Sequence, residues 1–410
     1  MTSAPKSERL HIGIFGRTNV GKSILLNIIS GQDVALTSSL AGTTTDVVEK
    51  SLELSSLGPV VLLDTAGIDD TSTLAAARKS KMLKALSRCD VAILVVEDDY
   101  WSDYEEEIIS LLKNHNIEYI FVSNKYSNSA ASNKNSSTNN NNYTNYINSV
   151  SNIEMPNFDT LTNEKRDIFL KKITVELRKK TNNDDSAIEL FSDIISPNDI
   201  VVLVTPIDSG APKGRLIMPQ VQTLRALLDK KAVSIIVQPE EYKQVLNILT
   251  KKIKLVVCDS QVVKQVMELT PEDIYITTFS ILFARLKGDL LTEIEGAEKI
   301  KTITPNDKIL IAEACSHHAQ TDDIATVKIP KLLEKYLGFA PQIHYSHGRD
   351  YPENLSEYKL VIHCGSCMIT RKEKINRINL AISNNIAFTN YGIAISFLNG
   401  YMHRAVNIFN

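Results

Sequence analysis

A glycine-rich segment near the N-terminus limits most strongly the folds open to this chain of 410 residues. Residues 11–15 (HIGIF) predict a short buried strand, and residues 24–29 predict a helix. Between them lies GRTNVGKS (16–23), which has the GxxxxGKS spacing of a phosphate-binding loop. Because the motif stands in the required strand–loop–helix context, a glycine-rich turn without function is a poor alternative. The segment therefore predicts a P-loop nucleotide-binding domain with an α/β fold.

The residue types in this loop match the chemistry of phosphate binding. The glycines allow backbone N–H groups to surround the phosphates, and the N-terminus of the following helix favours negative charge. We expect Lys22 to reach the outer phosphates and Ser23 to bind Mg²⁺ through its hydroxyl group. The residues expected to bind the nucleotide in this segment are Gly16, Arg17, Thr18, Asn19, Val20, Gly21, Lys22 and Ser23.

Two further segments follow in the order that a nucleoside triphosphatase requires. Residues 41–46 (AGTTTD) form a polar loop at a suitable distance to close over the nucleotide. Residues 60–67 (VVLLDTAG) predict a buried strand that brings Asp64 to the Mg²⁺ shell, and Gly67 can offer a backbone N–H to the γ-phosphate. Three such segments in order indicate a GTPase.

The fragments GRTNVGKS, AGTTTD and DTAG resemble the TrmE–Era group of GTPases over residues 1–125. The resemblance implies that Thr44 completes the Mg²⁺ shell and that Asn19 helps to hold a catalytic potassium ion. It also implies that Ile68 stands where Ras-like enzymes have a water-orienting glutamine, so that hydrolysis is slow or assisted by another group. The catalytic residues expected on this basis are Lys22, Ser23, Thr44, Asp64 and Gly67.

The base-reading segment departs from that group. Residues 117–122 predict a strand, and Asn124 and Lys125 begin an NKxD-like motif in which Ser127 takes the place of the aspartate. A neutral hydroxyl group cannot accept the paired hydrogen bonds of guanine as a carboxylate does, so the selectivity for the base is in doubt. The later serine–alanine loop is not clear either, and residues 149–151 (SVS) are a weak candidate.

An asparagine-rich tract follows the base-reading segment. We expect an insertion at about residues 127–155 to be disordered, because it has few large aliphatic side chains to bury. Residues 164–180 predict the last helix of the GTPase domain, whose limits are set at 1–195.

A second domain is predicted at residues 196–274 from alternating strands and helices, an arrangement typical of a small parallel α/β domain. Its sequence contains no group of residues typical of a catalytic site, so docking or dimerisation is its expected role. The predicted strands are 200–204, 233–237 and 254–257, and the predicted helices are 219–228, 242–249 and 262–269.

A third domain, at residues 275–410, contains three of the five cysteines. Residues 308–313 and 358–362 predict buried strands that end at the sequences CSH (315–317) and HCGSC (363–367). Adjacent parallel strands would bring both sequences to one edge of a sheet, where open α/β sheets place their sites. Thiolates bind soft metals and iron–sulfur clusters, so this pattern predicts a metal or cluster site. His344 and His347 are expected in a loop between the two halves.

The residues leave more than one kind of site open. Four ligands (Cys315, His363, Cys364 and Cys367) could close a structural zinc site. Three thiolates, from Cys315, Cys364 and Cys367, could instead hold a 4Fe-4S cluster and leave one iron to His363, His317, water or a guest ligand. A redox CxxC or a chance pattern is a weaker alternative. A disulfide framework is disfavoured by the odd number of cysteines in a chain of this length.

The composition restricts the partners. The net charge of −3 gives no bulk electrostatic reason to expect binding to nucleic acid or to acidic membranes. No run of 18 apolar residues is present, and only about ten residues precede the first strand. We therefore expect a protein of the cytoplasm or of a reducing organelle such as a hydrogenosome.

The order of an Era-like GTPase domain, the segment APKGRLIMPQVQT (211–223) and the CxH…HCxxC pattern resembles the HydF family of FeFe-hydrogenase maturation GTPases. The resemblance implies a small parallel α/β dimerisation domain and an α/β domain that binds a 4Fe-4S cluster. It also implies a homodimeric scaffold that binds GTP, Mg²⁺ and K⁺. Such a scaffold receives a diiron precursor made by two radical-SAM maturases and delivers it to the apo FeFe-hydrogenase.

Two alternatives from other classes stay open. One is an Era- or TrmE-like RNA-associated GTPase with a structural zinc site, which would be colourless and would bind RNA. The other is a binding module whose GTPase domain has lost hydrolysis, as the altered base-reading motif allows.

Overall fold

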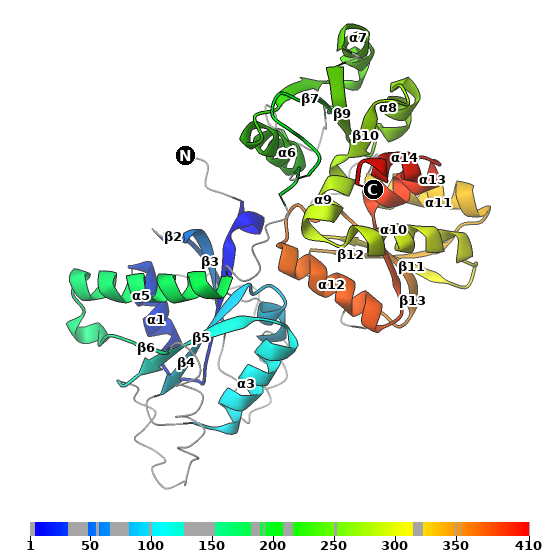
Figure 1. Cartoon of the computed structure of the whole chain (residues 1–410). Helices are drawn as coiled ribbons and strands as arrows, with labels where there is room; N and C mark the ends of the chain where they lie inside the picture. The colour runs from blue at the N-terminus through cyan, green and yellow to red at the C-terminus, as the bar shows by residue number, and fades with distance from the viewer. Residues whose placement is uncertain are drawn as a thin grey trace. The chain divides into compact units, whose positions relative to one another are not determined.

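The computed structural model describes most of the chain in two compact units, residues 1–187 and 188–410, each of which is considered by itself (Figure 1). The described residues are 5–31, 48–54, 57–65, 82–97, 101–126, 152–181, 189–191, 193–207, 216–249, 252–314, 323–348, 351–352 and 354–409.

The first unit is built on a sheet with the strand order β2-β3-β1-β4-β5-β6. Strand β2 is antiparallel to β3, and the other neighbouring strands are parallel. Parallel strands are covered on both faces, which explains why β1, β4 and β5 are almost wholly apolar. The strands are β1 (Leu10–Phe15), β2 (Val48–Leu54), β3 (Gly58–Asp64), β4 (Val91–Glu97), β5 (Glu118–Asn124) and β6 (Asn152–Glu154).

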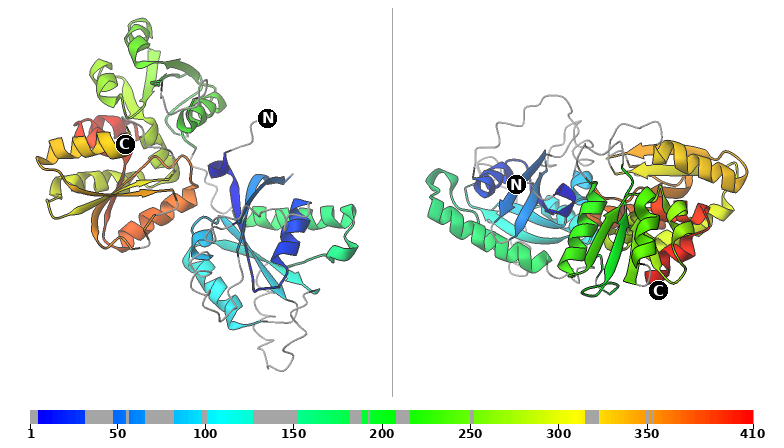
Figure 2. Two further views of the ribbon diagram at one scale, coloured as in Figure 1. Left: turned by 180° about the vertical axis from the view of Figure 1, so that it is seen from behind. Right: turned by 90° about the horizontal axis from the view of Figure 1, so that it is seen from above.

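Helices cover the two faces of this sheet, as Figures 1 and 2 show. Alternate strand residues enter two separate cores, because successive side chains of a strand point to opposite faces. Helices α1 (Lys22–Ser30) and α5 (Asn163–Thr181) pack in one core, and α3 (Asp103–Asn114) packs in the other. Short 3₁₀ turns η1 (Lys6–Glu8) and η3 (Phe158–Thr160) complete the unit among the residues described.

The second unit contains two four-stranded sheets, both wholly parallel. Their strand orders are β10-β9-β7-β8 and β12-β11-β13-β14, so in each sheet the first strand in sequence lies between the second and the third. The first sheet consists of β7 (Ile200–Val204), β8 (Val233–Val237), β9 (Ile253–Cys258) and β10 (Tyr275–Thr278). The second consists of β11 (Lys308–Glu313), β12 (Gln342–His347), β13 (Tyr358–His363) and β14 (Ala387–Asn390).

Apolar side chains from both sheets and from the helices between them form one shared core in this unit. The first group of helices comprises α6 (Met218–Asp229), α7 (Pro239–Leu249), α8 (Val263–Leu269), α9 (Phe279–Lys287) and α10 (Leu290–Glu298). The later elements are η5 (Lys299–Thr302), the π-helical turn η6 (Ile324–Lys328), α11 (Ile329–Leu337), α12 (Arg371–Ser383), α13 (Tyr391–Leu398), α14 (Met402–Val406) and η7 (Asn407–Phe409).

The two sheets meet where β10 leads into α9 and β14 leads into α13. Thr278 caps α9 and Asn390 caps α13, each by accepting a hydrogen bond from a backbone N–H of the first turn. A Cβ atom at Gly392 would lie 2.5 Å from the Cβ of Ser280, so only glycine permits this approach of the two helices. The side-chain amide of Asn390 also donates to the carbonyl of Ser280, at 3.3 Å.

The α/β fold class predicted from the sequence is confirmed. The structure differs from the sequence interpretation at two edge strands, β6 and β12. His344 and His347 lie on β12 and not in a loop. The end of the predicted insertion (127–155) forms β6, which pairs with β5. Residues 127–151 lie outside the described part. The division into domains at 195 and 274 stays a prediction, and the limit near 275 falls inside the sheet to which β10 belongs.

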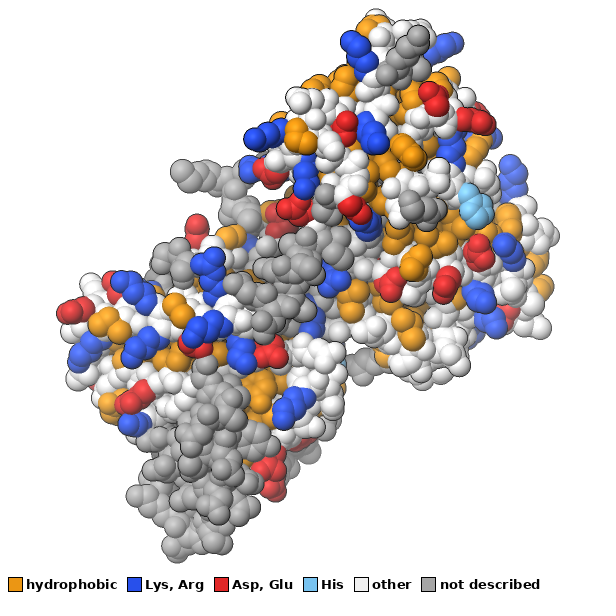
Figure 3. Space-filling view, in the orientation of Figure 1, with side chains coloured by type: hydrophobic (Ala, Val, Ile, Leu, Met, Phe, Trp, Pro, Cys, Tyr) orange, Lys and Arg blue, Asp and Glu red, His pale blue; other side chains and the backbone are white. Residues whose placement is uncertain are grey.

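Charged side chains of both signs lie among small groups of hydrophobic ones on the face shown in Figure 3. None of the helices in the described part of the chain has the length and apolar character needed to cross a membrane.

The buried His11 of β1 makes the first unit sensitive to pH. Burial is the main cause that lowers the pKa of this side chain from 6.5 to about 4, and its Nδ1 donates to the carbonyl of Arg9 at 2.9 Å. The folded unit therefore binds fewer protons than the unfolded chain between these pH values. We expect the free energy of unfolding to be constant above pH 6.5 and to fall by up to about 3 kcal/mol as the pH decreases to 4.

This prediction is checked by denaturant unfolding followed through the fluorescence of Trp101, the one tryptophan of the chain, which is buried in the same unit. His11→Gln should reduce the pH dependence, whereas the same change at the exposed His403 should not. An equal pH dependence in all three proteins would contradict the assignment.

Candidate functional site

The phosphate-binding loop follows β1 and has a backbone that glycine makes possible. Gly16 has φ 147°, Asn19 has φ 63° and Gly21 has φ 106°. A Cβ atom at Gly16 would lie 2.5 Å from the carbonyl oxygen of Val95, and one at Gly21 would lie 2.5 Å from the Asn124 side chain. The two glycines are therefore required both by the backbone angles and by the space available.

Lys22 begins α1 and is only 8% exposed. Its ammonium group donates to the carbonyl oxygens of Gly16 and Arg17, at 2.7 and 2.6 Å. Asp64 ends β3, and burial raises its pKa while the charge of Lys22 acts in the opposite direction. Ser23 is exposed at the start of the helix. The structure thus brings together three predicted residues: a phosphate-binding lysine, a hydroxyl group and a partly buried carboxylate.

The side chain of Arg17 turns toward buried carboxylates, a role that the sequence analysis missed. Its Nε donates to Glu105 at 2.8 Å, and its Nη2 donates to Glu97 at 3.2 Å. Glu105 also accepts from the backbone N–H and hydroxyl of Ser102, so it forms the capping box of α3. Arg17 therefore anchors the loop to α3, and its predicted part in nucleotide binding rests on its backbone. The S-x-x-E spacing of residues 102–105 is the sequence pattern from which the capping role of Glu105 could have been predicted.

Asn124 joins the base-reading segment to the phosphate-binding loop. Its amide donates to the carbonyl of Val20 at 2.8 Å and its Oδ1 accepts from the backbone N–H of Tyr126 at 3.0 Å. Lys125 pairs with Glu154 at 3.2 Å near the surface. Several predicted residues of this unit lie outside the described part, namely Thr44, Gly67, Ile68, Ser127 and the candidate at 149–151.

The second site lies at the ends of β11 and β13, which are parallel neighbours with Ala312 opposite His363. The backbone N–H of Cys364 donates to Ala312 at 2.8 Å, and the N–H of Ala314 donates to the sulfur of Cys364 at 3.1 Å. Cys315 follows Ala314 in the sequence, but Cys315 and His317 lie outside the described residues. The predicted meeting of the two strand ends is therefore seen, and the thiol of Cys364 faces the strand that leads to Cys315.

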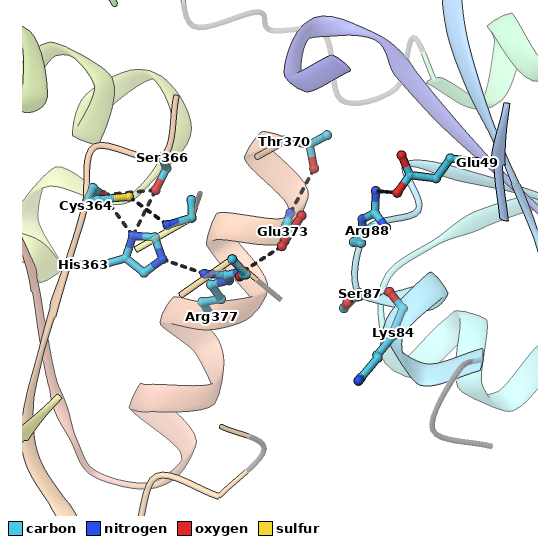
Figure 4. A network of polar contacts seen from close by, with 12 residues as sticks. Glu49, Lys84, Ser87, Arg88, His363, Cys364, Ser366, Thr370, Glu373 and Arg377 are labelled. Atoms are coloured by element: carbon cyan, nitrogen blue, oxygen red, sulfur yellow. Dashed lines mark hydrogen bonds and ion pairs between the residues drawn. The ribbon is translucent and has the colours of Figure 1, made fainter. Parts of the chain in front are cut away.

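His363 is fully buried beneath the cysteine loop and stacks on Phe388. Figure 4 shows its ring between Cys364 and Ser366 on one side and Arg377 on the other. Its Nε2 lies 2.9 Å from Nη1 of Arg377, which can only donate. Its Nδ1 therefore carries the hydrogen and donates to the carbonyl of Cys364 at 2.9 Å, with the hydroxyl of Ser366 3.2 Å away. Burial first, and then the charge of Arg377, hold the pKa of His363 well below its usual range.

These contacts bear on the predicted ligand role of His363. Both ring nitrogens have protein partners in this arrangement, so iron or zinc could bind only if one hydrogen bond were given up. His347, on the edge strand β12, has its Nδ1 3.0 Å from Glu313, and His344 has its Nδ1 3.2 Å from the hydroxyl of Tyr358. Among the described residues, these side-chain partners lie on β11 and β13 and not in the cysteine loop.

Burial keeps the two described thiols of the loop protonated. It raises the pKa of Cys364 and raises the pKa of Cys367 to about 11. A thiophilic metal would replace these protons, so the donor set suits iron or zinc. No group of three or more potential ligands occurs within the described ranges, which contain Cys364, Cys367 and His363 but neither Cys315 nor His317.

Three family models match successive parts of the chain. One described as a 50S ribosome-binding GTPase matches residues 11–125. The hydrogen maturase F dimerization domain matches residues 190–288, and the hydrogen maturase F tetramerization domain matches residues 291–408. The last two contain the two four-stranded sheets.

Curated relatives resemble the N-terminal part. The tRNA modification GTPase MnmE of Jannaschia sp. (strain CCS1) is 44% identical over 107 residues, 24% of this chain and 24% of the relative. GTPase Der of Wolinella succinogenes is 36% identical over 121 residues, 28% of this chain and 26% of the relative. The chain thus spans about a quarter of the length of these relatives. A solved structure of a variant of Aquifex aeolicus Era, bound to GDP and AlF₄⁻, aligns with a TM-score of 0.31 and 18% identity, covering 63% of this chain and 97% of that one.

The matches agree with the architecture. A domain of the P-loop GTPase class precedes two segments that match maturase-specific models, and these segments hold the paired strand ends with their cysteines. The chain belongs to the hydrogen maturase F (HydF) family and carries a GTPase domain of the TrmE–Era type.

Proposed function

We propose that this protein is a GTP-hydrolysing scaffold in the maturation of FeFe hydrogenase. In this proposal it holds a 4Fe-4S cluster and transfers a diiron precursor to the apo-hydrogenase. The observation that carries the proposal is the presence, in one chain, of a phosphate-binding loop with Lys22 near Asp64 and of a cysteine loop in a segment that matches a maturase family. The two radical-SAM maturases that make the precursor are proposed partners.

Hydrolysis is assigned to the first unit through electrostatic stabilisation of the phosphates. The ammonium group of Lys22, held by two loop carbonyls, can turn to the outer phosphates of GTP. Ser23 and Asp64, with Thr44, would hold Mg²⁺, which neutralises phosphate charge when bound. Gly67 would donate its N–H to the γ-phosphate, and Asn19 would help to hold K⁺. Asn124 and Lys125 would shape the base pocket, while Ser127 weakens the preference for guanine.

The cluster is assigned to Cys315, Cys364 and Cys367. Three thiolates leave one iron for a ligand that is held weakly, and a bound cluster supplies an exchangeable position to which a guest diiron unit can bridge. We propose His363, His317 or solvent for this position. One hydrogen bond of His363, to Arg377 or to Cys364, would have to break for it to serve, which favours weak rather than permanent ligation. Reduced thiols of this kind suit the cytoplasm or a reducing organelle.

An edge strand in the first four-stranded sheet supports a homodimer. Strand β8 lies at the edge of its sheet, and Val233 and Ile236 on it are exposed. The adjacent helix α6 exposes Val221 and Leu228. An open apolar edge pairs readily with another strand unless it is covered. We propose that a second copy of this chain covers β8 and α6, and that neither nucleic acid nor membrane is a partner.

The first test concerns the phosphate-binding loop. Lys22→Ala should lower the rate of GTP hydrolysis by about 10²–10³-fold, because the developing phosphate charge loses its cationic partner. The iron content should stay at the wild-type value, since the cysteines lie in the other unit. Phosphate release and iron analysis measure both properties, with Lys171→Ala on the exposed face of α5 as the control. Undiminished hydrolysis in Lys22→Ala would exclude the assigned role.

The second test concerns the cluster. Serine at Cys315, Cys364 or Cys367 should remove most of the iron, whereas His363→Ala or His317→Ala alone should keep the cluster and change its spectrum. Cys89→Ser is the matched control, since Cys89 is buried in the first unit. Anaerobic reconstitution, iron and sulfide analysis and electron paramagnetic resonance give the answer. One zinc without sulfide in the native protein would favour the RNA-associated GTPase instead.

The third test concerns the proposed dimer. Ile236→Lys should weaken self-association by at least roughly tenfold, because two copies would bring buried like charges together at the edge. Ile248→Lys is the control, since Ile248 is more exposed and lies on α7 of the same domain. Sedimentation velocity over a range of concentrations measures the association. Equal dimer stability in the two variants would place the interface elsewhere.

A further inference from the structure

Helix α5 of the first unit carries apolar side chains on two opposite faces. Phe169, Ile173 and Leu177 point inward and belong to the core of that unit. Ile168 and Val175, seven residues apart, are each 50% exposed. Because seven residues make almost two full helical turns, these two side chains lie in line on the outward face. A single exposed aliphatic side chain is ordinary, but two in line at the centre of a helix face form an apolar ridge.

Positive charges border this ridge on both sides. Lys165, Lys172 and Lys179 follow one side at intervals of seven residues, and Lys171 and Arg178 follow the other with the same interval. All five are exposed, and Figure 3 shows Lys and Arg side chains gathered around hydrophobic ones over this helix. The α5 outer face is defined here by Lys165, Ile168, Lys171, Lys172, Val175, Arg178 and Lys179.

The charge of this helix is opposite to that of the chain as a whole. Helix α5 contains seven lysine and arginine residues and three acidic ones, a net charge of +4, whereas the chain has a net charge of −3. Lys179 pairs with Glu176 at 2.6 Å. The other four cations of the α5 outer face form no ion pair with any residue in the described part of the chain. Like charges on one face repel one another, so an anionic partner would stabilise it.

Contacts with the rest of the unit hold the helix in place. Arg166 donates through Nε to the carbonyl of Ile28 at 2.7 Å and through Nη2 to that of Ile29 at 3.0 Å, at the end of α1. Near the other end of α5, Lys180 pairs with Glu118 of β5 at 2.9 Å. The α5 outer face is therefore formed before any partner arrives, which lowers the entropic cost of binding.

The spacing along the face indicates the shape of the partner. An apolar seam that repeats every seven residues with charges on both sides is the pattern by which one helix packs along another. We propose that the α5 outer face binds an acidic amphipathic helix of a partner protein. Aliphatic side chains of that helix would pack on Ile168 and Val175, and its Glu or Asp side chains would pair with the flanking cations. The inference concerns the first unit and does not depend on the proposed cluster.

The same face suits nucleic acid and membranes less well. Phosphate backbones are bound by cations and hydrogen-bond donors, and single-stranded bases stack on aromatic rings. Here aliphatic side chains occupy the centre, and the only aromatic residue of α5, Phe169, is buried in the core. A helix that lies in a membrane surface inserts a broad apolar face, and the broad apolar face of α5 is already covered by the core.

The test uses the full-length protein and a fluorescently labelled helical peptide of about 20 residues, with leucines at seven-residue intervals flanked by glutamates. A second peptide has glutamine in place of every glutamate. The variants are Lys172→Glu and Ile168→Ser. Lys84→Glu, at an exposed lysine of the same unit, and Ile248→Ser, at an isoleucine that is 70% exposed on α7, are the matched controls. Fluorescence anisotropy measures binding, and circular dichroism checks that each variant is folded.

We expect Lys172→Glu to weaken binding of the glutamate peptide by at least roughly tenfold, because repulsion replaces attraction beside the seam. Ile168→Ser should weaken it by roughly fivefold through the loss of apolar contact. The two control variants should bind like the wild-type protein. The glutamine peptide should bind at least about tenfold more weakly than the glutamate peptide, and higher ionic strength should reduce the difference between them.

A single-stranded RNA and vesicles of phosphatidylcholine with phosphatidylglycerol are titrated in the same way. Tighter binding of either probe, abolished by Lys172→Glu, would assign the face to nucleic acid or to membranes and overturn the inference. No binding of the glutamate peptide, or equal binding by the wild-type protein, Lys172→Glu and Ile168→Ser, would also overturn it. GTP hydrolysis and iron content, measured on the same samples, report on the proposed function separately.

Discussion

The parallel pairing of β11 with β13 determines where the cysteine chemistry of this protein can lie. These strands are adjacent in the sheet although nearly fifty residues separate their ends, and the register puts Ala312 opposite His363. The backbone bond from Cys364 to Ala312 and the contact between the Ala314 N–H and the Cys364 sulfur follow from that register. A shift of one residue would turn the side chains at this strand end to the opposite face. The cysteine site therefore depends on the apolar interiors of two strands that contain none of its cysteines.

The same construction recurs in the other sheet of the second unit. Both sheets have the same strand order, and β9 occupies the position that β13 has in its own sheet. Cys258, at the end of β9, pairs with Val204 as His363 pairs with Ala312. Yet Cys258 is buried in the core, and burial raises the pKa of its thiol, so it serves as an apolar side chain. In one sheet, the carboxyl ends of the strands thus carry a loop with two thiols. The equivalent end of the other sheet packs against this sheet through the contact between Ser280 and Gly392.

Strands β1, β3, β5, β7, β11 and β13 could be predicted from sequence because most of their side chains are apolar. The same is true of the phosphate-binding loop, whose glycines, lysine and serine are contiguous. Strand β12 could not be predicted so easily, since its mostly exposed residues include the polar side chains of His344 and His347. The partners of Arg17 and Lys287 lie about eighty or more residues away in the sequence. Local patterns do not report such contacts, which exist only when the register and packing of whole sheets are set.

The two sites place a lysine in the same way. Lys22 and Lys287 are both almost wholly buried, and each donates to backbone carbonyl oxygens of a loop that binds, or is proposed to bind, an anionic group. Carbonyl oxygens satisfy the ammonium group without cancelling its charge, whereas a carboxylate would neutralise it. Both ammonium groups are therefore held at their loops by backbone carbonyl oxygens. Arg17 pairs with Glu97 and Glu105 and so fastens its loop to α3. Arg377 pairs with Glu373 within α12 and reaches the end of β13 through its hydrogen bond to His363. At each loop, a buried lysine thus bonds to backbone carbonyl oxygens, and an arginine paired with a carboxylate lies beside it.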